Sequence, residues 1–106
     1  MFARIVRMNL KPGEGPGYTR ALDQEIIPTL RKFPGFTGEI AMVSIDGKEA
    51  IGISLWDRKE SAESYNRRGY AGVVKALEKY VEGEPELQTC EVTNSTFEAL
   101  PVRKAA

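Results

Sequence analysis

The sequence predicts an α+β domain whose elements run β-α-β-β-α-β, an order that permits a ferredoxin-like antiparallel sheet with helices on one face. Alternating apolar residues at 2–10 indicate a strand, and apolar residues at helical spacing over 18–33 indicate a helix. Two strand-like runs, 36–45 and 49–56, are joined by the dipeptide Asp46-Gly47. Asp-Gly between such runs is typical of a hairpin with a type I′ turn, in which both central residues have positive φ.

The remaining elements follow from local signals. Three glycines and two prolines predict a loop over 11–17, and Pro28 predicts a kink in the first helix or a helix in two pieces. Asp57 is expected to cap the second helix, with Glu60 completing an approximate capping box. Gly69 should break that helical region.

The last strand is expected at 86–97, after Gly83 and Pro85 end the preceding helix. The chain is expected to form one domain over 1–100, and the tail 101–106 is expected to fray.

Composition excludes several classes of function. Fifteen acidic and fifteen basic residues cancel, so the clustered basic excess of a nucleic-acid-binding protein is missing. One cysteine, Cys90, cannot form an intramolecular disulfide. No apolar run approaches the ~20 residues that span a bilayer, so we expect no membrane partner and a cytoplasmic location.

Histidine is absent from the chain. This removes the commonest general base near neutral pH and the commonest ligand of zinc, haem and non-haem iron. No metal site is therefore expected.

The two middle strands are apolar on both faces. In the second of these strands, Ile51, Ile53 and Leu55 point to one face and Trp56 to the other. In the first, Ile40 and Met42 point to one face, and the apolar residues at 41, 43 and 45 point to the other. Two helical regions can cover only one face of the sheet, and a one-sided sheet would show a cleaner alternation. We therefore expect a homodimer that pairs through the other sheet face.

Local sequence resembles a known family. The segments are Lys11-Pro12-Gly13, Phe33-Pro34-Gly35-Phe36 and Trp56-Asp57 with Ala62 and Tyr65 after it. Over residues 2 to 97 this pattern resembles the antibiotic biosynthesis monooxygenase-like family of the dimeric α/β-barrel superfamily. The resemblance implies two subunits paired sheet-to-sheet, with a ligand cavity in each between the sheet and its helices.

The resemblance also bears on chemistry. Some members oxygenate phenolic substrates without metal or flavin, so no cofactor is expected, whereas others degrade haem with an axial histidine. The corresponding region here holds Lys75, and the chain has no histidine, so haem degradation is not expected. Family members often carry a histidine where this chain has Tyr65.

Five residues are candidates for the ligand pocket. Trp56, Tyr65 and Tyr70 would shape an apolar pocket, although structural packing is the favoured explanation of each, in the core or at the dimer interface for Trp56. Asn9 and Arg7 share one face of the first strand, from which a polar group can reach a cavity, but a solvated strand end would also place them there.

Other polar residues are assigned structural roles. Arg4 is expected to be exposed, Tyr18 to anchor the first helix, and Cys90 to be a small buried hydrophobic residue. No catalytic residue is assigned.

These observations favour a cofactor-independent monooxygenase acting on a small aromatic or quinol-type substrate. The alternatives are a non-catalytic dimeric domain that binds a small apolar ligand or serves as an interaction module, and a regulatory effector-binding module. The last would need a fused DNA-binding partner.

Overall fold

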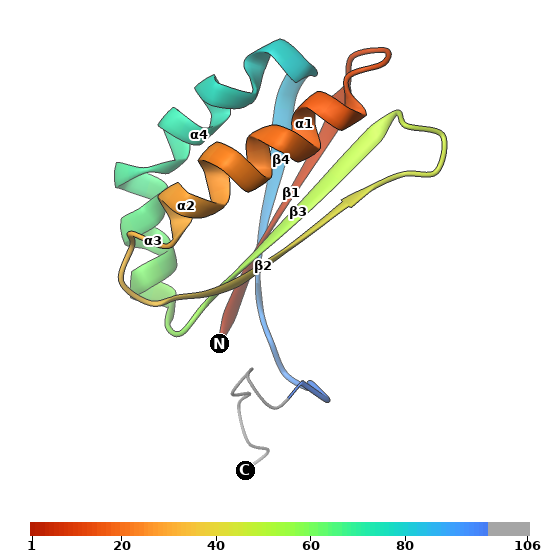
Figure 1. The fold of residues 1–106 in the computed structure, drawn as a ribbon. Helices are drawn as coiled ribbons and strands as arrows, with labels where there is room; N and C mark the ends of the chain where they lie inside the picture. The colour runs from red at the N-terminus through yellow and green to blue at the C-terminus, as the bar shows by residue number, and fades with distance from the viewer. Residues whose placement is uncertain (98–106) are drawn as a thin grey trace.

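The computed structural model describes residues 1–97 and contains one antiparallel sheet of four strands in the order β2-β3-β1-β4. The helices cover one face of this sheet (Figure 1). The α+β class and the order of elements are confirmed. The elements are β1 (Phe2–Leu10), α1 (Gly15–Ala21), the π-helix η1 (Leu22–Ile26), α2 (Ile27–Leu30), β2 (Phe36–Val43), β3 (Glu49–Trp56), α3 (Lys59–Arg68), α4 (Tyr70–Leu77), the 3₁₀-helix η2 (Glu78–Tyr80) and β4 (Val81–Glu91). The expected fraying of 101–106 lies outside the described residues.

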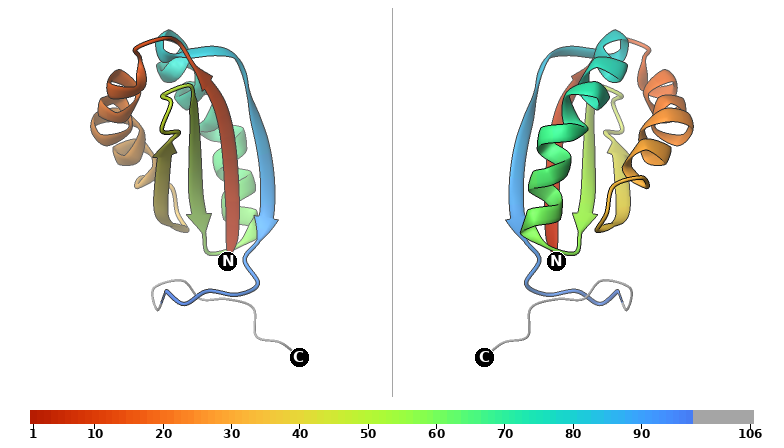
Figure 2. Two further views of the ribbon diagram at one scale, coloured as in Figure 1. Left: turned by 90° about the vertical axis from the view of Figure 1, so that its right-hand side faces the viewer. Right: turned by 90° about the vertical axis from the view of Figure 1, so that its left-hand side faces the viewer.

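Pairing between strands fixes which side chains face the helices. Even-numbered residues of β1, from Arg4 to Leu10, point toward the helices, and Trp56 at the end of β3 does the same. The helices lie along the sheet as a single layer (Figure 2). The core therefore forms between one helical layer and one sheet face.

The first helical region is interrupted, as Pro28 predicts. The helix begins at Gly15, three residues before Tyr18, and changes to a π-helix over Leu22–Ile26. Pro28 occupies the first turn of α2, where its missing N–H costs least. The wider turn ahead of it absorbs the break in the hydrogen-bond ladder.

The hairpin between β2 and β3 is confirmed, but the type I′ turn is wrong. Gly47 has φ of 74°, and no non-glycine residue among those described has positive φ, so Asp46 does not meet the type I′ requirement. The connection is a longer loop. Gly47 N–H donates to the Ser44 carbonyl at 2.8 Å, and Asp46 Oδ1 accepts from Ser44 Oγ and from the Lys48 N–H.

The boundaries of α3 and β4 also differ from the prediction. Arg58 rather than Asp57 is the cap of α3, and it makes no side-chain capping bond. β4 begins at Val81 rather than residue 86 and ends at Glu91. Gly83 and Pro85 do not stop it because a register shift between Arg7 and Asn9 lets the strand bend past them. The break at Gly69, between α3 and α4, is confirmed.

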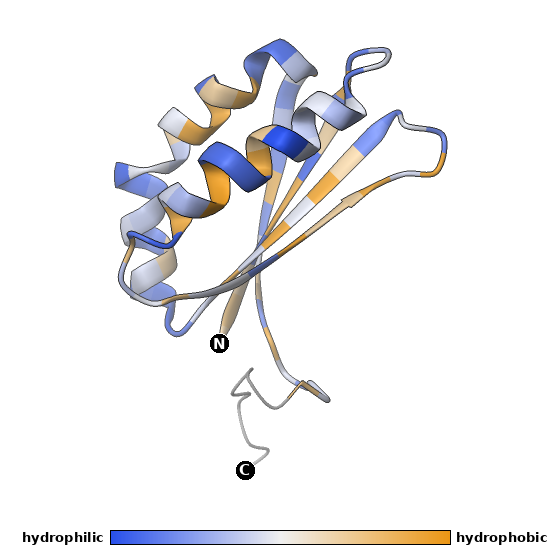
Figure 3. Cartoon of the chain, in the orientation of Figure 1, coloured by the Kyte–Doolittle hydropathy of each residue, from blue (hydrophilic) through white to orange (hydrophobic). Residues whose placement is uncertain are grey.

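The second sheet face is bare and partly apolar. Ile40 and Met42 on β2 are 40% and 44% exposed, and their partners on β3 are Ile53 and Ile51. Figure 3 shows hydrophobic residues along both strands. No helix in the described part of the chain is both long and apolar enough to cross a membrane.

Candidate functional site

A cavity of about 90 Å³ lies between the sheet and the helices. Its walls are mostly apolar, and Leu22, Ile26 and Leu30 of the first helical region face Val73 and Leu77 of α4 across it. The polar side chains that line it come from seven elements. They are Arg4, Tyr18, Glu39, Ser54, Tyr65, Tyr70 and Glu78.

The floor of the cavity is a row of residues across three strands. Ser54 on β3 is directly opposite Arg4 on β1 and directly opposite Glu39 on β2. Adjacent strands lie ~4.8 Å apart, so Arg4 and Glu39 are separated at the backbone by roughly 9–10 Å. The small Ser54 side chain between them leaves the space above β3 open.

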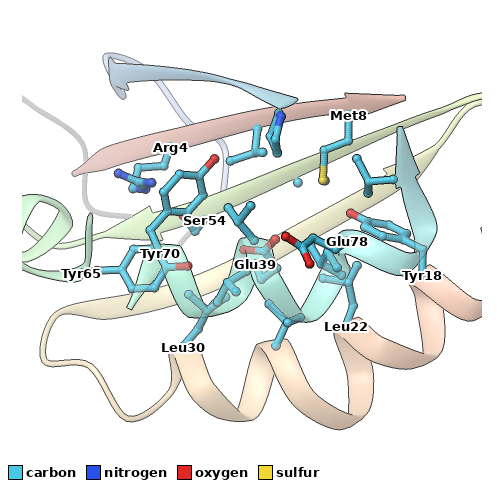
Figure 4. A pocket seen from close by; sticks show the side chains of 18 of the residues that line it. Arg4, Met8, Tyr18, Leu22, Leu30, Glu39, Ser54, Tyr65, Tyr70 and Glu78 are labelled. Carbon is cyan, nitrogen blue, oxygen red and sulfur yellow. The ribbon is translucent and has the colours of Figure 1, made fainter. Parts of the chain in front are cut away.

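Gly52 extends this opening along β3. A Cβ atom at Gly52 would lie 3.2 Å from Glu39 Oε1 and 3.8 Å from the Tyr18 hydroxyl oxygen. Those two polar side chains therefore converge over the glycine. Figure 4 shows Arg4, Tyr65 and Tyr70 at one end of the cavity, Tyr18 at the other and Glu39 between them.

Arg4 is buried, with 3% of its surface exposed. Its Nη1 donates to Asn66 Oδ1 at 2.9 Å, and its guanidinium carbon lies 4.7 Å from the ring centroid of Tyr70 and 5.1 Å from that of Tyr65. Nε and Nη2 have no hydrogen-bond partner. Burial lowers the pKa of Arg4 from its usual value, although the group stays charged at neutral pH.

Glu39 and Tyr18 form the second polar feature. Burial raises the pKa of the Glu39 carboxyl to about 8, so most of it is protonated at neutral pH. Burial, with a smaller effect of Glu39, raises the pKa of the Tyr18 phenol above its ordinary value. Neither Glu39 Oε2 nor the Tyr18 hydroxyl has a hydrogen-bond partner.

The unpaired buried atoms all belong to this one site. In the described part of the chain four buried side-chain atoms lack a partner, and they belong to Arg4, Tyr18 and Glu39. Buried polar groups in folded proteins are nearly always hydrogen-bonded, so several orphans around one cavity indicate that water or a ligand completes them.

Tyr65 and Tyr70 both line the cavity. Their role as ligand contacts stays a prediction. Burial raises the pKa of both phenols, while the nearby Arg4 lowers it by a smaller amount. Trp56 does not line the cavity. It is fully buried, stacks on Tyr65 with ring centroids 5.0 Å apart, and donates from Nε1 to Ser54 Oγ at 2.9 Å. The core interpretation of Trp56 is thus the one that fits.

Of the two explanations for Arg7 and Asn9, the solvated strand end is the one that fits. Arg7 and Asn9 lie on the bare sheet face, beside Glu49 and Glu86, and do not reach the cavity. Arg4, which was expected to be exposed, is instead the buried arginine of β1. Its even number matches the apolar positions of β1, and that parity is the signal that could have identified it.

Glu39 was missed by the sequence reasoning, and Tyr18 was assigned only an anchoring role. Glu39 lies in β2 next to apolar Ile40. Which of these two neighbours points toward the helices is decided by the pairing register of β2 with β3, which the sequence does not state. Among the described residues no group of three potential metal-ligating side chains is found.

Comparisons with known proteins support the fold. No known family profile and no curated protein matches the sequence. Solved structures do match. A monooxygenase from the gene ActVA-Orf6 of Streptomyces coelicolor, in complex with Nanaomycin D, has a TM-score of 0.77 and 16% identity, covering 91% of this chain and 90% of that one.

SnoaB, a cofactor-independent oxygenase from Streptomyces nogalater, has a TM-score of 0.72 and 13% identity, over 92% of this chain and 97% of its own. A structure described as an antibiotic biosynthesis monooxygenase has a TM-score of 0.69 and 12% identity, over 89% and 100%. The chain therefore has the fold that the sequence resemblance indicated. At these identities the likeness concerns the fold alone.

Proposed function

We propose that this chain is a cofactor-independent monooxygenase that acts on a small aromatic, phenolic or quinol-type substrate in the cavity between sheet and helices. The observation that carries the proposal is the set of unpaired buried polar atoms of Arg4, Tyr18 and Glu39 around one apolar cavity. The shared fold with monooxygenases, including an oxygenase described as cofactor-independent, supports the reaction class.

The reaction balances without an added reductant. A base removes a proton from the substrate, and the resulting carbanion passes electrons to O₂, so that a C–O bond forms and gives a hydroperoxide. Loss of water then breaks the O–O bond and leaves a carbonyl group. The substrate loses two hydrogen atoms and gains one oxygen atom, and the second oxygen atom leaves as water.

The cavity suits the first step. Glu39, with a pKa of about 8, has the acidity at which a general base works efficiently near neutral pH. The apolar side chains of Leu22, Ile26 and Val73 exclude bulk water, which would otherwise protonate the carbanion. Glu39 faces the ligand space directly and is the candidate catalytic base.

The size of the cavity favours a single-ring substrate. A volume of about 90 Å³ holds several water molecules. It is smaller than the cavity of about 150 Å³ that takes up benzene in an engineered protein. One ring can therefore enter if the lining shifts slightly at the solvent-exposed end near Glu78 and Gly83. A three-ring substrate would need a much larger rearrangement.

We also propose that a second copy of the chain covers the bare sheet face. Ile40 and Met42 are large hydrophobic residues exposed on that face, and Ile5, Ile51 and Ile53 extend the same patch over β1 and β3. An exposed apolar patch that spans three strands is typical of an interface.

Isotope labelling tests the reaction. The purified protein is incubated under ¹⁸O₂ with a single-ring quinol or a three-ring anthrone, and the products are analysed by mass spectrometry. We expect one ¹⁸O atom in the product, which is a hydroxyquinone from the quinol and an anthraquinone from the anthrone. We also expect faster turnover of the single-ring substrate and no loss of rate with a metal chelator. Rates equal to those in buffer for both substrates would contradict the proposal and favour a non-catalytic ligand-binding domain.

A further inference from the structure

Among the described residues, Arg4 has a buried guanidinium whose charge is not balanced by its neighbours. Only 3% of its surface is exposed, and two of its three nitrogens have no hydrogen-bond partner. Burying a charge without a matching partner costs several kcal/mol or more in folded proteins. Asn66 Oδ1 and the faces of Tyr65 and Tyr70 offset part of this cost, but none of the three carries a negative charge at neutral pH.

A natural counterion for Arg4 lies in the same cavity but does not reach it. Glu39 lies two strands away, beyond Ser54, and no ion pair joins it to Arg4. In residues 1–97 no other carboxylate pairs with Arg4 either. The space between the two groups is the cavity itself, so whatever fills the cavity meets an unpaired cation at one end.

We infer that Arg4 binds an ionised oxygen on a single aromatic ring, a phenolate or ring carboxylate, that enters this cavity. The inference rests on the proposed function only in that the cavity holds an aromatic ligand. A guanidinium gives two parallel N–H donors to such an oxygen, and hydrogen bonds with a charged partner are the strong ones. The ring of the ligand would then lie among the apolar residues of the helices.

The other titratable groups around the cavity leave Arg4 as the main determinant of charge at neutral pH. Glu39 on β2 is mostly protonated. The phenols of Tyr18, Tyr65 and Tyr70 are neutral, since the ordinary pKa of a phenol is already well above neutral pH and burial raises the pKa of each further. Glu78, from η2, lines the solvent-exposed end. An anion at the Arg4 end therefore meets one positive charge and no buried negative charge.

The chemistry of catalysis agrees with this placement. A proton passed from the substrate to Glu39 leaves Glu39 neutral and moves the negative charge onto the ring. The anion that forms is then held by Arg4 at the opposite end. Arg4 would touch the reacting ligand and stabilise the charge that develops on it.

A pair of dye probes tests the inference without turnover. 4-Nitrophenol is a single-ring phenol whose phenolate is yellow, and 4-nitroanisole has the same ring with a methylated oxygen that cannot ionise. Binding of both is measured by titration calorimetry at pH 7.5, and the absorbance of bound 4-nitrophenol reports its ionisation. We expect the wild-type protein to bind 4-nitrophenol at least tenfold more tightly than 4-nitroanisole and to shift the bound dye toward the phenolate.

Three substitutions give the contrast. Arg4→Met keeps most of the apolar stem and removes the charge, Arg4→Lys keeps a charge without the planar donor pair, and Arg67→Met removes an exposed arginine of α3. We expect Arg4→Met to lose the preference for the ionised probe and to leave 4-nitroanisole binding within twofold. We expect Arg4→Lys to retain part of the preference and Arg67→Met to retain all of it.

Thermal melting separates this binding role from a structural role. Replacing a buried unpaired charge by an apolar side chain is often neutral or stabilising, so Arg4→Met should melt at the wild-type temperature or above. The inference is overturned if the wild-type protein binds both probes equally or binds neither. It is also overturned if Arg4→Met keeps the preference for the ionised probe, whatever its melting temperature. A protein that passes these tests but incorporates no ¹⁸O would retain the anion site and lose only the proposed reaction.

Discussion

Arg4 and Glu39 lie on either side of Ser54 in one row across three adjacent strands, face the same cavity, and form no ion pair with each other. Two groups of opposite potential charge that line one apolar space without meeting leave room for a third group between them. The two groups also differ in their charge, because Arg4 stays charged at neutral pH whereas Glu39 is mostly protonated.

The stability of the protein should fall as the pH rises toward 8, and Glu39→Gln should remove that fall. The pKa of Glu39 is about 8 in the folded chain against an ordinary value of 4.5, so between these values the folded state holds a proton that the unfolded state releases. Stability therefore decreases with rising pH across this window and levels off above it.

The free energy of unfolding should change by about a few kcal/mol, because each unit by which folding shifts the pKa of Glu39 corresponds to about 1.4 kcal/mol. Urea unfolding of wild-type, Glu39→Gln and the exposed-site control Glu25→Gln at pH 5, 7 and 9 measures it. Glu39→Gln should be the most stable of the three at pH 9. A wild-type stability that does not change between pH 5 and pH 9 would refute the buried, protonated state of Glu39.

Turnover should rise with pH through about 8 in the wild-type protein and lose this limb in Glu39→Gln. The reason is that only ionised Glu39 can take the substrate proton, and loss of a general base typically costs about 10²–10⁴ in rate. Oxygen uptake with a single-ring quinol from pH 6 to 9.5, corrected for the rate in buffer, gives the profile. Persistence of the rising limb in Glu39→Gln would assign the base to another group.

Gly52→Ala should weaken ligand binding with little effect on folding. The added Cβ would lie 3.2 Å from Glu39 Oε1, so the carboxyl must give way by a few tenths of an ångström, and the methyl group itself takes up space at the cavity wall. The matched control is Gly72→Ala on α4, where an added Cβ meets nothing within 4 Å. Calorimetric titration with 4-nitrophenol should show a several-fold weaker affinity for Gly52→Ala, and the same affinity in both variants would place the ligand elsewhere.

Ile53→Lys should convert a dimer into a monomer. Ile53 lies at the centre of the bare sheet face, paired with Ile5 and Ile40 across the neighbouring strands, so a charge there would be buried at the proposed interface. Ile45→Lys is the control, because Ile45 is fully exposed at the hairpin. Light scattering at micromolar concentration should give twice the chain mass for wild-type and Ile45→Lys only. A monomeric wild-type protein would rule out the dimer at that concentration.

The sequence predicts the architecture well because the relevant signals are local. Apolar periodicity locates the elements, Pro28 marks the interruption of the first helix, and the Asp46-Gly47 pair marks the hairpin. The predicted turn type was wrong because the Asp-Gly dipeptide also occurs in a five-residue loop in which the glycine alone adopts the left-handed conformation. The beginning of β4 was missed because a bulge allows a strand to continue through glycine and proline.

The site was predicted less well because it depends on parity and register. Arg7 and Asn9 are polar residues in a strand, yet their odd numbers place them on the bare face, whereas Arg4 shares the parity of buried Met8 and Leu10. General reasoning puts arginine outside, since burying its charge is costly, and a functional site is where that rule fails. Glu39 could be recognised only after the pairing with Ser54 placed it on the cavity face.

The central claim, that the cavity takes an aromatic ligand, is tested most directly by methyl NMR during titration with 4-nitrophenol. The methyl groups of Val6, Val73 and Leu77 line the cavity, whereas those of Ile40 and Ile53 lie on the bare sheet face. We expect ring-current shifts that saturate with ligand at the first set and are absent from the second. Shifts confined to the methyl groups of the sheet face, or no saturable shift at any methyl group, would contradict the claim.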